Sequence, residues 1–401
     1  MRHSLRLQVA AFTATRVVLN TMHRMIYPFL LTFGRGLGVD MAALTLAVTA
    51  RSLVGASGPF LAWVADNHGR KVGMIFGLVL FVLGASLVII WPTYLAFCLA
   101  LLLTILGKYV FDPAMQAYLG DRVSYERRGR VLGITEMGWS LAFILGVPLM
   151  GFLIARRGWT APFPVLAILG LAAIAVLVWL VPRDLPHPDN QNGLWRNLGS
   201  VLTSPLAVTG LAMSLMLSAG NEVVNLVFGV WMESSFGLRI AALGVASAVI
   251  GFAELGGETL TATITDRLGK PPAVAAGVLL NSLAALALPF LGSTLPGAFI
   301  GLFLFYLTFE FAIVSSIALM TEVLPPARAT LMASGIAAHS LGRALGALVT
   351  APLFAMGQAS ASTPDILPSA LASAAFNLIG LLALYRLHTR MARRPAVKTL
   401  G

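Results

Sequence analysis

Two carboxylates stand four residues apart in one of the long apolar stretches of this sequence. Glu254 and Glu258 lie within residues 241–264, where most other residues are aliphatic or small. Residues four apart share one face of a helix, so the two like charges would lie close together. A bound proton relieves such repulsion. The chemistry expected of this pair is therefore the binding and release of a proton.

Other charged and amide side chains interrupt the apolar stretches, mostly basic in the first half of the chain and mostly acidic in the second. They are Arg16, Asn20, Arg24, Arg51, Lys108 and Asp112, then Asn221, Glu222, Asn225 and Glu310. The first three of these are spaced by four residues and form one stripe on a helix. Charges in apolar surroundings are costly unless they face a cavity or a partner. This set is the candidate solute site, and its mixed charge suits an amphipathic or zwitterionic solute.

Two other interpretations stay open on the sequence alone. Lys108 and Asp112 have opposite charges four residues apart, so they can simply pair with each other. Basic residues of the first half can also pair with acidic residues of the second and hold one conformation. The residues open to this interpretation are Arg16, Arg24, Arg51 and Glu222.

The elements that position these side chains follow from composition. Hydrophobic residues make up 58% of the 401 residues and charged ones 11%, which indicates a lipid environment. Crossing a bilayer core of about 30 Å takes roughly 20 apolar residues in a helix, and such stretches recur along the chain. They lack the period-two alternation of a membrane barrel. The sequence predicts an all-α, polytopic membrane protein.

Twelve stretches qualify as transmembrane helices. They cover residues 7–33, 41–64, 72–91, 94–119, 131–155, 161–181, 203–231, 241–264, 271–291, 296–320, 330–356 and 366–387. A polar, Pro- and Asn-rich segment at 182–202 separates six spans from six. The predicted organisation is an N-terminal bundle over 1–181, a cytoplasmic linker over 182–202, and a C-terminal bundle with a basic tail over 203–401.

Lysine and arginine are distributed unequally between the two sides of this arrangement. Most lie on the side that holds both termini and the 182–202 linker; the other side has Arg35, Arg156, Arg157 and Arg239. The positive-inside rule then places both termini in the cytoplasm, with the chain in the cell (inner) membrane. The net charge of +11 is explained by this topology and by anionic lipid, and needs no nucleic acid.

Short motifs recur in the two halves. Asp66, Gly69, Arg70 and Lys71 follow the second span, and Asp266, Arg267, Gly269 and Lys270 follow the eighth, with Gly269 standing 200 residues after Gly69. After the fourth and tenth spans, an acid precedes an arginine by six residues: Asp121 and Arg127, then Glu322 and Arg328. Matching motifs at matching places indicate an internal repeat.

These features resemble the major facilitator superfamily (MFS), whose loop signature reads Gly-x-x-x-Asp-Arg-x-Gly-Arg-Arg/Lys. The first copy departs from it at Ala62 and Asn67. The resemblance implies two pseudo-symmetric six-helix bundles, a central cavity lined by spans one, four, seven and ten, and a monomer. It also implies gating loops that latch the cytoplasmic side when the transporter faces outward. The gating-loop residues are Asp66, Gly69, Arg70, Lys71, Asp121, Arg127, Arg128, Arg130, Asp266, Arg267, Gly269 and Lys270.

The fifth span contains Gly146-Val-Pro148-Leu-Met-Gly151, similar to the Gly-Pro-x-x-Gly-Gly motif of drug/proton antiporters in this superfamily, although a packing kink explains it equally well. The expected function is proton-coupled efflux (antiport) of a drug-like or amphipathic metabolite by alternating access. Proton-coupled uptake of an organic anion and translocation of a lipid or amphiphile are the alternatives.

Other protein classes fit less well. The connections are too short for a catalytic domain and carry no catalytic triad, metal-ligand cluster or ATP-binding Gly-x-x-x-x-Gly-Lys-Ser/Thr motif, so an enzyme is not expected. A non-transporting receptor or assembly factor would lose the cavity charges and gating loops that this chain keeps. The expected partners are a small-molecule solute and membrane lipids, with no metal or cofactor and with an ion gradient, H⁺, as energy source.

Overall fold

The computed structural model describes residues 5–57, 69–123, 125–182, 191–324, 327–360 and 366–392, and all regular elements in them are helical. The first half contains α1 (Leu5–Arg24), α2 (Leu30–Leu37), α3 (Met41–Gly55), α5 (Arg70–Ile90), α6 (Tyr94–Arg122), α7 (Tyr125–Glu136), α8 (Gly138–Leu141), the π-helical turn η1 (Ala142–Gly146), α9 (Val147–Arg157) and α10 (Pro162–Leu180). α11 (Gln191–Thr203) follows. The second half contains α12 (Pro205–Phe236), α13 (Ile240–Leu268), α14 (Lys270–Leu291), α15 (Leu295–Val323), α16 (Arg328–Ser360) and α17 (Leu367–Ala392).

The helices confirm the predicted all-α membrane fold. Among the described residues, ten spans are long and apolar enough to cross a bilayer, and α2 with α3 gives an eleventh if this pair, bent by 112°, counts as one span. The predicted spans 7–33 and 41–64 fall on α1 with α2 and on α3. Neither α1 nor α3 is among the ten on its own, because α1 carries the polar stripe and α3, at 15 residues, is short.

The first span is broken rather than continuous. α1 ends at Arg24 and α2 begins at Leu30, with irregular backbone across Tyr27 and Pro28. Proline disfavours helical backbone in the residue before it and has no N–H to donate, so a helix is expected to break there. The break leaves the polar stripe of α1 at the middle of the chain's first passage through the molecule.

The fifth predicted span is also irregular. α7 ends at Glu136, α8 begins at Gly138, and η1 widens the helix just before Pro148 in α9. Pro148 cannot donate the hydrogen bond that a regular helix would place there, and π-helical turns are one way in which a helix absorbs such a defect. The antiporter-like segment Gly146–Gly151 therefore coincides with a local change in helix geometry.

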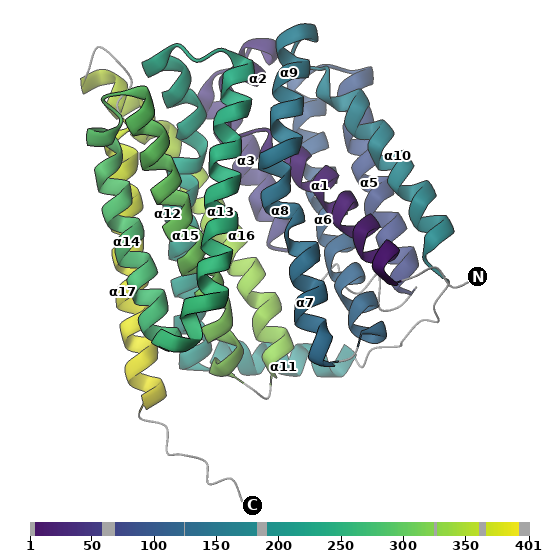
Figure 1. The fold of residues 1–401 in the computed structure, drawn as a ribbon, viewed down its shortest axis with the longest axis vertical. Helices are drawn as coiled ribbons and strands as arrows, with labels where there is room; N and C mark the ends of the chain where they lie inside the picture. The colour runs from purple at the N-terminus through teal and green to yellow at the C-terminus, as the bar shows by residue number, and fades with distance from the viewer. Residues whose placement is uncertain are drawn as a thin grey trace, which may run out of the picture.

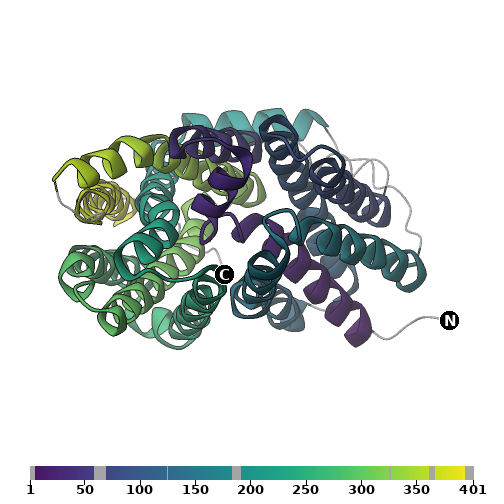
Figure 2. The ribbon, with the colours of Figure 1, turned by 90° about the horizontal axis from the view of Figure 1, so that it is seen from above.

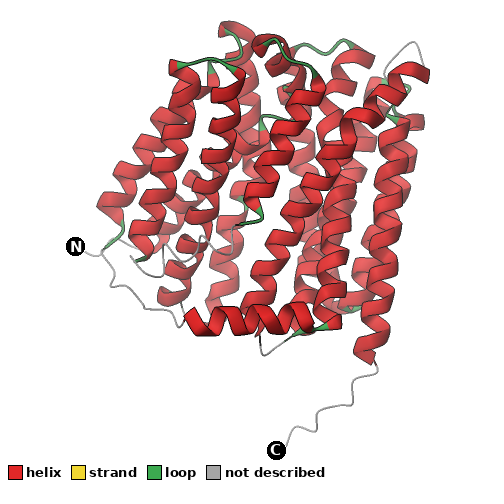
Figure 3. Ribbon diagram, turned by 180° about the vertical axis from the view of Figure 1, so that it is seen from behind, coloured by secondary structure: helices red, strands yellow, loops and turns green. Residues whose placement is uncertain are grey.

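The helices form two groups. Figure 1 shows α12 to α17 on one side, α1 to α10 on the other, and α11 running across the end near the C-terminus. Figure 2, looking along the helices, shows the same two groups, and Figure 3 shows α11 lying across the helix ends from behind. α11 thus occupies part of the predicted 182–202 linker, of which 183–190 lie outside the described residues.

The apolar core joins the two halves unevenly. One cluster of buried residues contains side chains from both halves, including Phe29 and Phe33 with Phe228 and Trp231. A second cluster contains only side chains of α11 and the second half, and includes Val201. The second-half side chains of the shared cluster, such as Phe228, Trp231 and Leu243, lie toward the end of the molecule away from α11 (Figure 1).

Glycines bring the two halves together at this end. A Cβ on Gly229 would lie 2.7 Å from Pro28 Cα and from the Tyr27 carbonyl oxygen, and one on Gly244 would lie 3.1 Å from Pro148 Cα. These positions join α12 to the break after α1, and α13 to α9. Small residues let membrane helices approach closely enough for backbone packing, so the halves are in direct contact at the end opposite α11.

The sequence repeat reappears in the backbone. Gly69, before α5, has φ 95° and ψ 150°, and Gly269, before α14, has φ 84° and ψ 146°. This region is essentially restricted to glycine. Beside each turn an ion pair joins consecutive long helices: Arg70 Nε lies 3.8 Å from Asp121 Oδ2, and Lys270 pairs with Glu322. The structure confirms the internal repeat at these positions.

Replacing Gly269 by alanine should destabilise the protein, because a side chain there forces a conformation that costs on the order of 1–3 kcal/mol. The purified protein should unfold at a lower temperature than wild type in a thermal-shift measurement. Gly335→Ala is the control, since Gly335 lies within α16 with no atom within 4 Å of an added Cβ. Equal unfolding temperatures for the two variants would show that the turn tolerates a side chain.

Candidate functional site

The polar stripe of α1 binds carbonyl groups at the break between α7 and α8. Arg16 Nη1 donates to the Thr135 carbonyl (2.9 Å), Asn20 Nδ2 to Gly138 (3.1 Å), and Arg24 Nη1 to Trp139 (3.0 Å). Helix ends leave backbone carbonyls without intrahelical partners, and inside a membrane these need donors. The break and the stripe therefore satisfy each other, which fixes α1 against α8.

Arg24 also makes an ion pair between the two halves. Its Nη1 and Nη2 donate to Glu254 Oε2 and Oε1 on α13, at 2.7 and 2.5 Å. The guanidinium carbon lies 4.2 Å from the Trp139 ring centre and 3.4 Å from that of Phe143. Side-chain exposure is 3% for Arg24 and 4% for Glu254. The pair is bidentate and buried, and its guanidinium lies over two aromatic rings, so losing one partner would leave an unpaired buried charge.

Glu254 belongs to a group of three carboxylates that we call the acidic cluster, made up of Glu254, Glu258 and Glu310 with Arg24. Glu258 is half-buried and accepts a hydrogen bond from Ser140 Oγ at 3.2 Å. Glu310 on α15 is 8% exposed and interacts electrostatically with both other glutamates and with Arg24. α15 approaches α13 closely here because Gly257 has no side chain: a Cβ on it would lie 2.7 Å from Glu310 Cβ.

A second group of charges lies within the first half. Arg16 pairs with Asp112 (Nε to Oδ1, 3.1 Å) and with Glu136 (Nη1 to Oε1, 2.7 Å), and Lys108 Nζ donates to Asp112 Oδ2 at 2.5 Å. These four residues form the Arg16 network. Lys108 and Asp112 thus pair with each other, as one of the sequence interpretations held. Arg16 has its ion-pair partners in its own half.

A third group crosses between the halves and centres on Glu222 of α12, which is fully buried. Arg51 Nη2 donates to the Tyr27 hydroxyl at 2.9 Å, and that hydroxyl donates to Glu222 Oε1 at 3.0 Å. Arg51 Nη1 also donates to the His23 carbonyl at 3.0 Å. Arg343 on α16 interacts electrostatically with Glu222 and Tyr27. We call Arg51, Tyr27, Glu222 and Arg343 the Glu222 chain.

The amide residues of the candidate site have different surroundings. Asn225 accepts a hydrogen bond from the Tyr306 hydroxyl at 2.7 Å, within the second half. The Oδ1 atoms of Asn20 and Asn221 are buried and, within the described residues, have no hydrogen-bond partner. The three groups and these amides together account for all ten predicted cavity residues and both predicted proton residues.

The described gating-loop residues interact within each half. Arg70 pairs with Asp121 and Lys270 with Glu322, while Lys71 Nζ donates to the Val178 and Val181 carbonyls at 2.7 and 2.6 Å. Lys71 therefore caps the C-terminus of α10. Asp266 and Arg267 are exposed at the end of α13. Asp66 lies outside the described residues, as do the side chains of Arg127, Arg128 and Arg130.

Sequence reasoning missed the aromatic and hydroxyl groups that hold the charges in place. Trp139 and Phe143 flank Arg24, and Tyr109 lies 2.9 Å from Ser340 Oγ between α6 and α16. Trp139 carried a detectable signal, since it stands in the interior of a predicted span, far from the membrane interfaces where tryptophan concentrates. Nothing in the sequence pointed to a role for Ser140.

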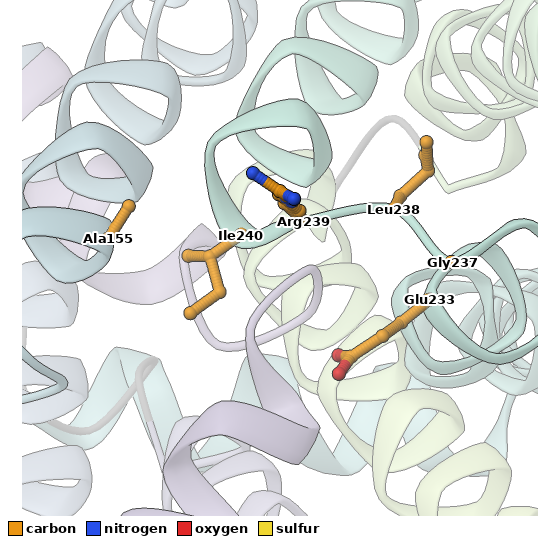
Figure 4. Close-up of a pocket in the computed structure, with 6 residues that line it drawn as sticks. All are labelled: Ala155, Glu233, Gly237, Leu238, Arg239 and Ile240. Carbon is orange, nitrogen blue, oxygen red and sulfur yellow. The ribbon is translucent and has the colours of Figure 1, made fainter.

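A surface hollow of about 510 Å³ lies apart from these groups, at the end of the molecule where α12 leads into α13. Figure 4 shows its lining residues, Ala155, Glu233, Gly237, Leu238, Arg239 and Ile240. Glu233 also accepts a hydrogen bond from Arg35 at 2.6 Å, which joins α2 to α12. The hollow lacks the buried charges of the three groups, so it is not the candidate site.

Comparison with known proteins identifies the family. The family model described as Major Facilitator Superfamily matches residues 13–347. An uncharacterised MFS-type transporter of Bacillus subtilis, YceJ, is 25% identical over 295 residues, which cover 73% of this chain and 74% of the relative. The synaptic vesicular amine transporter of Rattus norvegicus is 22% identical over 233 residues, or 58% of this chain and 45% of the relative.

A solved structure agrees at the level of the fold. The peptide transporter POT in complex with alafosfalin matches with a TM-score of 0.77 and 16% identity, over 98% of this chain and 97% of that chain. Its helices follow the same path although few residues are shared. With the family match covering most of the sequence, this chain belongs to the major facilitator superfamily and is an MFS-type transporter.

Proposed function

We propose that this transporter exports a small amphipathic organic solute in exchange for protons, by alternating access between residues 1–181 and residues 203–401. The observation that carries the proposal is the acidic cluster, in which two buried carboxylates and one half-buried carboxylate from the second half meet a single guanidinium from the first. A group that can gain or lose a proton and also joins the halves is what coupling requires.

The roles of the three glutamates differ. Glu254 accepts hydrogen bonds from Nη1 and Nη2 of Arg24, so its negative charge is neutralised in the ion pair that joins the halves. Glu258 has a neutral hydrogen-bond donor, Ser140, and Glu310 faces two like charges. We therefore assign proton binding to Glu258 and Glu310, and the link to Glu254. This revises the sequence hypothesis, in which Glu254 and Glu258 shared the proton.

Protonation would act on the link through charge. When Glu258 and Glu310 are ionised, both attract Arg24 in competition with Glu254 and both repel Glu254. When they carry protons, Arg24 and Glu254 attract each other without competition. A proton thus biases the equilibrium between joined and separated halves by its different interaction with the two states.

The distribution of basic residues supports the proposed orientation in the membrane. With both termini and α11 in the cytoplasm of the cell, the glycine contacts of Gly229 and Gly244 close the outer side. At the proposed cytoplasmic side, the gating-loop ion pairs among the described residues, Arg70 with Asp121 and Lys270 with Glu322, each lie within one half. This arrangement corresponds to a transporter that is closed to the outside, as expected before a solute is taken up from the cytoplasm for export.

Proton coupling can be tested by neutralising the glutamates one at a time. In proteoliposomes with a pH-sensitive dye inside, gradients of cationic, anionic and zwitterionic solutes are imposed. Glu258→Gln or Glu310→Gln should reduce solute-driven proton movement at least tenfold, because a site that cannot exchange a proton is lost. Glu233→Gln, at the outer hollow, should behave as wild type. If proton movement survives in both cluster variants, the assignment of the proton site is wrong.

The link between the halves can be tested by distance measurement. Spin labels at Arg157→Cys and Arg239→Cys, in a Cys98→Ala background, mark the ends of α9 and α13 at the closed side. Removing one partner of a buried ion pair costs about 3–5 kcal/mol, so Arg24→Ala should shift the electron–electron distance distribution toward longer separations.

The double variant Arg24→Ala/Glu254→Gln provides the matched control for this measurement. It removes both charges and leaves no unpaired carboxylate. Its spin-label distance distribution should therefore return part of the way to that of the labelled protein in which Arg24 and Glu254 are intact. Identical distributions in all three proteins would mean that the ion pair does not hold the halves together.

A further inference from the structure

We infer that the solute carries an anionic group, a carboxylate or a phosphate, which Arg51 and Arg343 bind between the two halves. This inference rests on the proposed function and adds the chemical class of the solute. Arg51 stands on α3 and Arg343 on α16, helices of different halves that pack against each other. An anion held by both residues would contact both halves at once.

The two arginines converge on the same groups. Both interact electrostatically with Glu222 and with Tyr27. Arg343 also interacts electrostatically with Tyr109, whose hydroxyl lies 2.9 Å from Ser340 Oγ, three residues before Arg343 on α16. These contacts come from the break after α1 and from α3, α6, α12 and α16, and they hold the guanidinium groups in one region.

Immediately around Arg51 and Arg343, positive charge exceeds negative charge. The cations that interact with the His23 ring are Arg24, Arg51, Lys108 and Arg343. Arg24 and Lys108 each have a carboxylate partner, Glu254 and Asp112. Among the described residues, Glu222 is the carboxylate that Arg51 and Arg343 share. Two guanidinium charges against one carboxylate leave one positive charge for an anionic ligand to neutralise.

Hydrogen-bonding atoms without a partner gather at the same place. In the described part of the chain, Arg51 Nε and His23 Nδ1 are buried and make no hydrogen bond, and Arg51 Nη1 donates to the carbonyl of His23 itself. Arg51 is 1% exposed and His23 is 9% exposed. Buried polar atoms in folded proteins are nearly all hydrogen-bonded, so such exceptions need an explanation. An incoming group with acceptor oxygens would supply the partner that Arg51 Nε lacks, and would accept from His23 Nδ1 in the tautomer that carries its proton there.

The geometry of the donors favours oxygen anions. Guanidinium groups present paired donors that match carboxylate and phosphate, whereas a cation would meet repulsion from both arginines. Arg343 is half-buried and Arg51 is enclosed, so an anion reaches Arg343 first. Once bound, it competes with Glu222 for both arginines and thereby weakens the contact that Glu222 makes with Tyr27 across the halves.

Hexanoate, hexyl phosphate and hexylamine test the inference, because they share one apolar tail and differ in head-group charge. Binding is measured by intrinsic tryptophan fluorescence on the full chain in lipid nanodiscs. At least one of the two anions should bind saturably, with hexylamine at least tenfold weaker. Arg343→Gln should weaken anion binding about tenfold or more, as expected for loss of a charged hydrogen bond. Arg35→Gln, at the outer end, should bind as wild type does.

The outcomes separate the possible head groups and the two proposals. Tighter hexanoate binding identifies a carboxylate, and tighter hexyl phosphate binding a phosphate; both support the inference. Equal binding of hexylamine, unchanged anion binding in Arg343→Gln, or no saturable binding of any probe would overturn it. Gel filtration checks folding, and Arg343→Lys, which keeps the charge but loses the paired donors, replaces Arg343→Gln if that variant aggregates. Because no proton gradient is used, a failure of proton coupling leaves this result unaffected.

Discussion

The link between Arg24 and Glu254 is the interaction on which the rest of the structure depends. It joins the halves at the level where their charged side chains meet, and it is buried on both sides. A charge pair in an apolar environment is stable only when its geometry is good and its remaining donors are satisfied. The rings of Trp139 and Phe143 and the Trp139 carbonyl meet that condition for Arg24.

Irregular helices provide the polar partners that these charges need. The irregular stretch from the end of α7 through α8 presents carbonyl groups that bind Arg16 and Arg24. The break after α1 places Tyr27 where it can connect Arg51 with Glu222. In a soluble protein, water would fill such breaks. Within a bilayer the chain must supply the partners itself, so helix defects and buried charges occur in the same places.

Hydrophobic stretches, the charge asymmetry and the repeated loop motifs were enough to predict the helical membrane fold, because bilayer thickness imposes span length on any sequence. The stripe on α1 was predictable from spacing as well. The ion-pair partners of the charged residues were not predictable, since the partner of a charge depends on which helix packs beside it. Glu254 and Glu258 share a helix face, yet Glu254 pairs with Arg24 from a distant segment. Spacing within one helix carries no information on contacts between helices.

The backbone contact between Gly229 and Pro28 limits the geometry of any movement of the halves. No side chain lies between the two segments, so a rotamer change cannot absorb movement there, and the backbones must either stay in contact or separate. In a rigid rotation about such a point, displacement grows in proportion to distance from it. The residues of α12 nearest Pro205 are farthest along the helix from this contact and would sweep the widest arc. A glycine acts in this way as a fulcrum, and the length of a transmembrane helix becomes its lever arm.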